Sequence, residues 1–287
     1  MGEGLRARLT YGNVVATIAA LGVFAAGGAY AAATIGSSDI KKNAVRGRHI
    51  KNDQVTGADV NEARLDATPL RTRVARGGCR AAIAGTGAMV KVGSVCIDRY
   101  EASVWSRPNG GVQYGVSGDN YPCLDNGQDC KGKIFARSVT GVTPSRYITW
   151  FQAQQALANS GKRLPTNAEW QMAVAGTPDS SACNVTSGIA NTGAFAACRS
   201  KYGINDMVGN VWEWTADWVP ASTACPDWGT FSDDSMCLSG ASTTAQGPGA
   251  IIRGGGFDNG TDAGPLSVHG IDLPSVSLVN LGFRGAR

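Results

Sequence analysis

The sequence predicts a loop-rich α+β domain with little regular secondary structure, over residues 79–287. Glycine is abundant, with 39 residues in a chain of 287, and charged residues make up only 17%. This composition suits a globular protein with many turns better than a helical bundle or a disordered chain. Residues 106–148 are rich in Gly, Asn, Asp and Pro, which predicts long loops. Two short segments carry clear helix signals, so both element types are expected.

Strands are expected at both ends of this domain. Residues 89–104 alternate enough between apolar and polar residues for one or two strands. Beyond Gly176 the chain returns to loops and short strands. It ends in the strand-like stretch LGFRGAR, residues 281–287.

Two helices are predicted between these strands. Thr149 can cap a helix over residues 150–159, which Gly161 would end in a left-handed conformation. Thr166 begins a second helix, because Thr166 and Glu169 have the spacing of a capping box. We therefore interpret Glu169 as a structural cap and not as a catalytic acid.

The run GINDMVGNVWEWTADW, residues 203–218, fits neither a helix nor a strand. Gly209 and Asn210 before Trp212 are unfavourable in a helix, and an Asn-Asp start is unfavourable in a strand. We expect an irregular loop, anchored by aromatic residues and held by side chains or by a bound ion.

Residues 1–33 form a candidate signal peptide or membrane anchor. Arg6 and Arg8 precede an apolar stretch from Val14 to Ala33, which ends in small residues of the A-x-A kind. This pattern is typical of a cleaved secretory signal. The stretch approaches the roughly 20 residues that cross a bilayer, so an uncleaved anchor is the alternative. Both interpretations predict a secreted or cell-surface protein.

Residues 34–78 are polar and basic and contain a ten-residue repeat. Ile40 and Val45 are echoed by Ile50 and Val55, and then by Val60. Two aliphatic residues in ten cannot build a core within one chain. The repeat therefore predicts a narrow β-solenoid or a multimeric stalk, such as a homotrimer through residues 34–62. A disordered linker is the equal alternative.

The basic excess of the chain lies upstream of the main domain. Residues 1–80 contain 12 Lys/Arg and 6 Asp/Glu, whereas residues 81–287 contain 14 and 16. The domain is thus nearly neutral, and it shows no basic patch of the kind that binds nucleic acid.

All eight cysteines follow the leader, which predicts disulfides in an exported protein. Neighbours in the sequence would pair and close short loops: Cys79–Cys96, Cys123–Cys130, Cys183–Cys198 and Cys225–Cys237. A metal site is the rival interpretation. It is disfavoured because the sequence has no C-x-x-C, and its only histidines, His49 and His269, lie far from any cysteine pair.

Three blocks of the sequence resemble the formylglycine-generating enzyme, or sulfatase-modifying-factor, family. They are GKRLPTNAEWQMAVAG (161–176), YGINDMVGNVWEWTADW (202–218), and IIRGGGF (251–257) with LGFRGAR. The resemblance covers roughly residues 88–287. It implies an α+β fold of the C-type-lectin-like kind, in which Trp212, Trp214 and Trp218 are expected to anchor the core.

The resemblance does not extend to the family's reactive residues. Formylglycine generators bind copper through two cysteines just after this RGG block, because thiolates hold Cu(I). Here RGGGF is followed by DNGTDAGP, and no cysteine follows Cys237. Copper and formylglycine generation are therefore not expected. A sister branch of iron enzymes draws its ligands from histidines, and two isolated histidines offer nothing equivalent.

The family's calcium chemistry is compatible with the matching residues. The resemblance implies carboxylate ligands from Asp206 and Glu213, with backbone carbonyls from Gly209 and Val211. It also implies a second site at Asn184 and the carbonyl of Val185. The calcium would be structural. The alternative is that Asp206 and Glu213 bind loop backbone without a metal.

The resemblance places a ligand groove between the RGGGF block and the last strand. Its candidate residues are Asp258, Asn259, Asp262, His269, Asp272 and Arg284. For His269, an ordinary surface or hydrogen-bonded histidine is the favoured interpretation. This layout is also similar to the variable ligand-binding proteins of diversity-generating retroelements.

Two functions are therefore in competition. The first is an exported, non-catalytic domain that binds an extracellular peptide or glycan or serves surface display. The second is an oxidoreductase-type enzyme of the same family, with an unknown substrate, that uses the groove residues.

Overall fold

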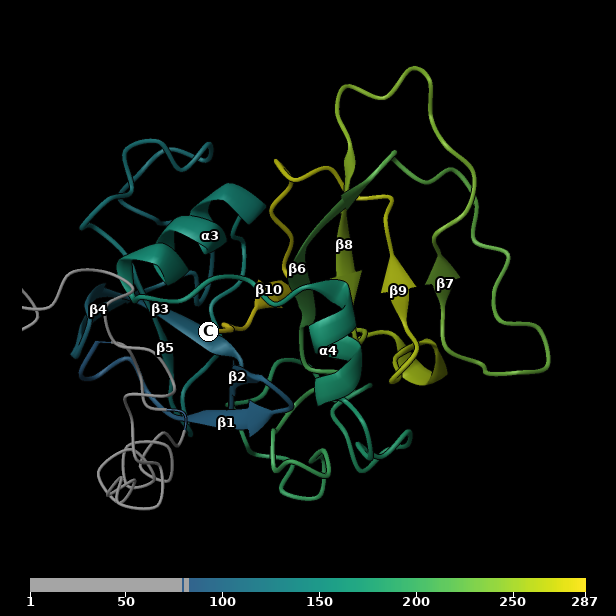
Figure 1. Ribbon diagram of the computed structural model, residues 1–287, viewed down its shortest axis with the longest axis horizontal. Coiled ribbons are helices and arrows are strands. Elements are labelled where there is room, and N and C mark those ends of the chain that lie inside the picture. Colours follow the sequence, from purple (N-terminus) through teal and green to yellow (C-terminus); the bar gives the residue numbers. More distant parts are fainter. Residues whose placement is uncertain (1–78, 80–82) are drawn as a thin grey trace, which may run out of the picture. The chain divides into compact units, whose positions relative to one another are not determined.

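The computed structural model describes Cys79 and residues 83–287 (Figure 1). The chain divides into two units, Met1–Ala67 and Thr68–Arg287, and the described residues all belong to the second. The predicted leader (1–33) and repeat stalk (34–78) lie outside them and stay predictions. Within residues 83–287, no helix has the length and apolar character needed to cross a membrane.

A five-stranded mixed sheet forms the centre of the domain (Figure 1). Strand β6 (Trp212–Val219) pairs antiparallel with β8 (Gly249–Arg253) on one side and parallel with β10 (Leu281–Phe283) on the other. Beyond β8 lie β9 (Val268–His269), which is antiparallel to β8, and β7 (Met236–Cys237), which is parallel to β9. Long loops separate these short strands, as the glycine content predicts.

Two smaller antiparallel sheets precede the central sheet in the sequence. Strands β1 (Met89–Val92) and β2 (Val95–Asp98) form a hairpin. Strand β3 (Ala102–Arg107) lies between β4 (Gly110–Tyr114) and β5 (Phe135–Ser138). Residues 106–148 are thus not entirely loop, because β4 and β5 both pair with β3.

Both predicted helices are confirmed. Helix α3 (Trp150–Asn159) is capped by Thr149, and Gly161 after it has a φ of +68°. Helix α4 (Asn167–Ala173) begins with the predicted capping box, in which Thr166 accepts a hydrogen bond from Glu169 N and Glu169 accepts one from Thr166 N. Helix α3 contacts β5, whereas α4 contacts β6, β8 and β1.

The run 203–218 is only partly the loop that was predicted. Its second half is β6, because β8 and β10, distant in the sequence, supply the hydrogen-bonding partners. Trp212 and Trp214 are core residues, only 4% and 0% exposed, as expected. The same expectation is wrong for Trp218, which lies near the end of β6 and is 43% exposed.

The core has two clusters. The larger packs Leu157 of α3 against Trp214 of β6 and Phe283 of β10. The smaller surrounds Trp170 of α4 and includes the Cys183–Cys198 disulfide. All four predicted disulfides are present, and their S–S distances lie between 1.98 and 2.09 Å. The predicted loop-rich α+β class is therefore confirmed.

Candidate functional site

The loop that leads into β6 contains several residues with positive φ, among them Asp206, Gly209 and Asn210. Gly209 has a φ of +71°, and a Cβ there would lie 2.3 Å from the carbonyl oxygen of Asn184, so only glycine fits. Asp206 and Asn210 have φ values of +57° and +60°. Short polar side chains tolerate this conformation better than other residues do. Both of these side chains are buried.

Glu213, the predicted calcium ligand on β6, forms a buried ion pair with Arg284. The Nε atom of Arg284 lies 2.8 and 2.7 Å from the two carboxylate oxygens, and Trp170 Nε1 donates to the same carboxylate at 2.7 Å. The other guanidinium nitrogens donate to backbone carbonyls, at Asp98, Asn205 and Asp206. Arg284 is fully buried, so the expectation that it lines a surface groove does not hold.

A third carboxylate, which sequence reasoning missed, completes this buried acidic cluster. Glu101 is fully buried and accepts hydrogen bonds from Asn210 Nδ2 at 2.6 Å and Val211 N at 3.1 Å. Burial first, and then the charges of Asp206 and Glu213, raise the pKa of Glu101 well above its usual value. Burial also raises the pKa of Asp206 to about 6. The single positive charge of Arg284 thus faces three carboxyl groups, those of Glu101, Asp206 and Glu213.

The predicted calcium ligands have the charge that a cation needs, but several of their oxygens already accept hydrogen bonds. Both oxygens of Glu213 are already hydrogen-bonded, and Asp206 Oδ2 accepts the N–H of Gly193 at 2.6 Å. The carbonyls of Asn184 and Val185 likewise accept backbone N–H groups, at 2.7 and 3.0 Å. Calcium at these two sets of residues therefore stays a prediction.

Two polar side chains in the loop after the RGGGF block, Asp258 and Asn259, are held by hydrogen bonds. Asn259 Oδ1 accepts hydrogen bonds from Trp212 Nε1 and from Gly256 N, both at 2.9 Å. Asp258 accepts from Asn280 Nδ2 at 3.1 and 3.2 Å. These side chains tie the loop after β8 to β6 and to the start of β10.

His269 on β9 lies beside Trp212. The two ring centroids are 4.4 Å apart, and His269 Nε2 is 2.9 Å from Ser235 Oγ. Burial lowers the pKa of His269 to about 4, against the opposing charge of Asp262. The imidazole is therefore neutral at neutral pH. This agrees with the expected hydrogen-bonded histidine; no sequence signal marked its partner Ser235.

The predicted groove residues thus do not form one site. Asp258, Asn259, Asp262 and His269 gather around Trp212, whereas Asp272 lies at the other end of β8, where its carbonyl accepts the N–H of Ala250 at 2.8 Å. Burial raises the pKa of the Asp272 carboxyl.

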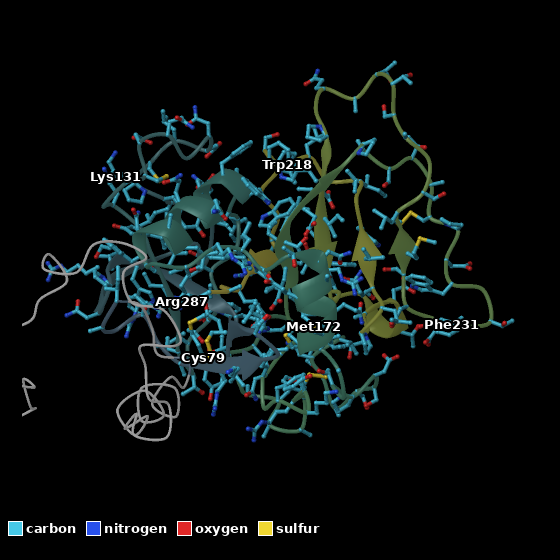
Figure 2. The ribbon with its side chains drawn as sticks, in the orientation of Figure 1. Cys79, Lys131, Met172, Trp218, Phe231 and Arg287 are labelled. Atoms are coloured by element: carbon cyan, nitrogen blue, oxygen red, sulfur yellow. A yellow bond between two sulfur atoms is a disulfide. The ribbon has the colours of Figure 1, made fainter. Side chains whose placement is uncertain are left out.

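An aromatic cavity, which sequence reasoning also missed, opens beside Trp218. Its volume is about 300 Å³, and its lining comprises Phe151, Trp218, Gln246, Gly247, Pro248, Leu273, Pro274 and Ser275. The ring of Trp218, which is labelled in Figure 2, packs edge-on against Trp150 and Phe151, with centroid distances of 5.0 and 5.8 Å. Nothing in the sequence marked this cavity, because Trp218 was expected in the core.

The family model of the sulfatase-modifying factor enzyme 1-like domain matches residues 41–287. The chain is 28% identical to the formylglycine-generating enzyme of Thermomonospora curvata over 174 residues, which are 50% of this chain and 55% of that protein. It is 29% identical to the hercynine oxygenase of Mycolicibacterium smegmatis over 136 residues, 41% and 32% of the two chains. The chain thus spans about a third to a half of these relatives.

Among solved structures, the P3c variant of the Major Tropism Determinant aligns with 73% of this chain and 54% of its own, with a TM-score of 0.47 and 20% identity. The family match covers most of the sequence, including every block on which the resemblance rested. The chain belongs to the sulfatase-modifying factor enzyme 1-like family, whose members include formylglycine-generating enzymes.

Proposed function

We propose that this chain is an exported, non-catalytic member of its family that binds an extracellular peptide or glycan. The proposal rests on the disulfide bonding and the positions of the cysteines. Each of the eight is held in a disulfide, and none lies in the block after Phe257. Cu(I) is held by thiolates, so the residues present do not fit a copper centre.

The aromatic cavity supports a binding role. Trp218 is 43% exposed although it belongs to strand β6 of the five-stranded sheet, and Leu273 and Pro274 of the predicted groove segment also line the cavity. Ligand sites are typically concave and lined by aromatic and apolar side chains with a few polar groups. Gln246 and Ser275 provide polar groups on the lining.

A structural calcium ion belongs to the same proposal. Glu101, Asp206 and Glu213 share the charge of Arg284 alone, and a cation held by Asp206 would relieve their repulsion. Oxygen ligands on an irregular loop suit Ca²⁺. The ion would fix the loop before β6 and would take no part in a reaction.

The same disulfides support export, because disulfides persist in oxidising compartments. The predicted leader, whether a signal peptide or an anchor, supports secretion or cell-surface display. The names of the relatives favour the alternative, an oxidoreductase that works without a cysteine pair. The test must therefore distinguish a binding protein from an enzyme.

The test applies three measurements to one preparation of the full chain exported by a host cell. We expect no free thiol in denaturant before reduction, no stoichiometric copper or iron, and binding to members of a glycan and sulfated-peptide array. Trp218→Ala should lose that binding while circular dichroism shows the chain still folded, whereas Phe231→Ala, an exposed aromatic distant from the cavity, should retain binding. Two free thiols, or one redox metal per chain, would instead support the enzyme.

A further inference from the structure

Three aspartates outside the sites described so far converge at the end of the central sheet. Asp179 follows helix α4, and Asp233 and Asp234 lie in the loop that the Cys225–Cys237 disulfide closes before β7. Each offers one carboxylate oxygen, and these oxygens all lie within 4.8 Å of one another. Unpaired carboxylates at such distances repel one another, and a bound cation would relieve that repulsion.

Asp234 is the member of this group that points most directly to a missing ligand. Its side chain is 1% exposed, and its Oδ2 accepts the N–H of Leu266 at 2.6 Å. Its Oδ1 is buried and has no hydrogen-bond partner in the described structure. A buried carboxylate oxygen without a partner carries a large desolvation cost. Gly264 lies against it, since a Cβ there would come within 1.5 Å of Oδ1.

A cavity of about 270 Å³ adjoins the aspartates. Asp179 and Asp233 line it together with four hydroxyl side chains, from Ser180, Ser181, Thr186 and Thr261, and Val185, Gly260 and Ala263 complete the lining. This volume exceeds what a single cation needs, so bound waters can complete its coordination. The cavity wall is built from the segment after α4, the loop before β7 and the turn at 260–263.

The nearby positive charge does not neutralise the group. Arg253 is close enough to Asp234 for its charge to be felt, but its guanidinium donates to the carbonyl oxygens of Pro265 and Leu266, at 3.2 and 3.3 Å. Burial, together with the neighbouring aspartates, raises the pKa values of Asp179 and Asp234, the latter to about 6. An excess of negative charge is therefore built into the site.

We propose that Asp179, Asp233 and Asp234 bind a calcium ion that ties the segment after α4 to the loop before β7. Carboxylate oxygens are hard ligands, and an irregular set from separate loops suits Ca²⁺ better than Mg²⁺, which demands near-octahedral geometry. Ser235 follows Asp234 directly and binds His269. The ion thus fixes one wall of the region around Trp212. This site is separate from the calcium proposed at Asp206.

Calcium binding to the full chain, after removal of metal with EDTA, tests this site. Equilibrium dialysis against CaCl2 gives the number of ions per chain and their affinity. Asp179→Asn and Asp233→Asn both change exposed side chains, so the fold should persist. We expect each to lose one bound ion per chain or to bind it at least about tenfold more weakly, because the charge of the ligand set determines affinity.

Asp227→Asn is the matched control, since it makes the same change at an exposed position of the same loop. Asp227 has a φ of +61°, which asparagine tolerates. In the variant, the amide oxygen of asparagine can accept the hydrogen bond that Gly229 N donates to Asp227 Oδ1. This control should bind calcium as the wild type does. Asp206→Asn distinguishes the two sites, because it should leave the ion at Asp233 in place.

Three results would overturn the proposal. They are a wild-type chain that binds no calcium at millimolar concentration, binding by Asp179→Asn and Asp233→Asn that equals the wild type, and an equal loss in Asp227→Asn. Circular dichroism of each variant confirms that the fold is intact. Failure here would leave the thiol and array results unaffected, so the proposed function is judged separately.

Discussion

His269 packs its ring on Trp212, bonds to Ser235, and has its pKa lowered by burial to about 4. In the unfolded chain the value returns to about 6.5. Between these values the unfolded state binds more protons, so the free energy of unfolding falls as the pH falls. The contribution is complete above pH 6.5 and is lost toward pH 4. We expect the wild type to lose about 1–2 kcal/mol over this window through His269.

His269→Gln isolates this effect, because glutamine can still bond to Ser235 but does not titrate. Urea unfolding of both proteins at pH 7 and pH 4.5 gives the difference in the free energy of unfolding. The carboxylates and His49 are common to both chains and cancel. An identical pH dependence for the two proteins would contradict the assignment.

At the scale of elements, the Glu213–Arg284 pair joins β6 to the chain just after β10. Both side chains are buried, and removal of the guanidinium leaves the three buried carboxylates with hydrogen bonds to neutral groups but without the positive charge of Arg284. We expect Arg284→Met to lower the free energy of unfolding by about 3–5 kcal/mol, because an uncompensated buried charge is strongly destabilising. Chemical unfolding at pH 7 in EDTA measures it.

Arg163→Met is the matched control. Arg163 binds Glu169 with a distance of 2.7 Å, but its side chain is 41% exposed. Exposed ion pairs contribute about 1 kcal/mol or less to the free energy of unfolding. Arg163→Met should therefore lower it far less than Arg284→Met does. An equal loss in the free energy of unfolding for the two variants would contradict the prediction that the buried carboxylates depend on the charge of Arg284.

The elements differ in how far the sequence predicts them. Both helices are correctly predicted, because their signals are local: Thr149 and Thr166 cap them, and Gly161 follows the first. Strand β6 is missed, since Asn210 and Gly209 suggest a loop and only β8 and β10 make the following residues extended. The same limit applies to Arg284, whose burial depends on Glu213, 71 residues away.

At the scale of the molecule, pairing between neighbours in the sequence is the part that can be predicted. The four disulfides join cysteines 7 to 17 residues apart, so the simplest pairing is correct. Asn259 and His269, both expected in the groove, each contact Trp212. The meeting of Asp179 with Asp233 could not be predicted, because two loops more than 50 residues apart must fold together first.

The repeat in residues 34–62 leads to a prediction for the whole chain. Aliphatic residues recur there too sparsely to form a core in one chain, and association of three chains would give each of them apolar neighbours. We expect the exported full chain to be a trimer by light scattering, and a chain that lacks residues 34–62 to be a monomer. Ile40→Ser with Ile50→Ser, which keeps the length unchanged, should also be monomeric, because the loss of apolar contact alone removes the driving force. A monomeric full chain would instead identify the segment as a linker, and the domain would then act as a single copy.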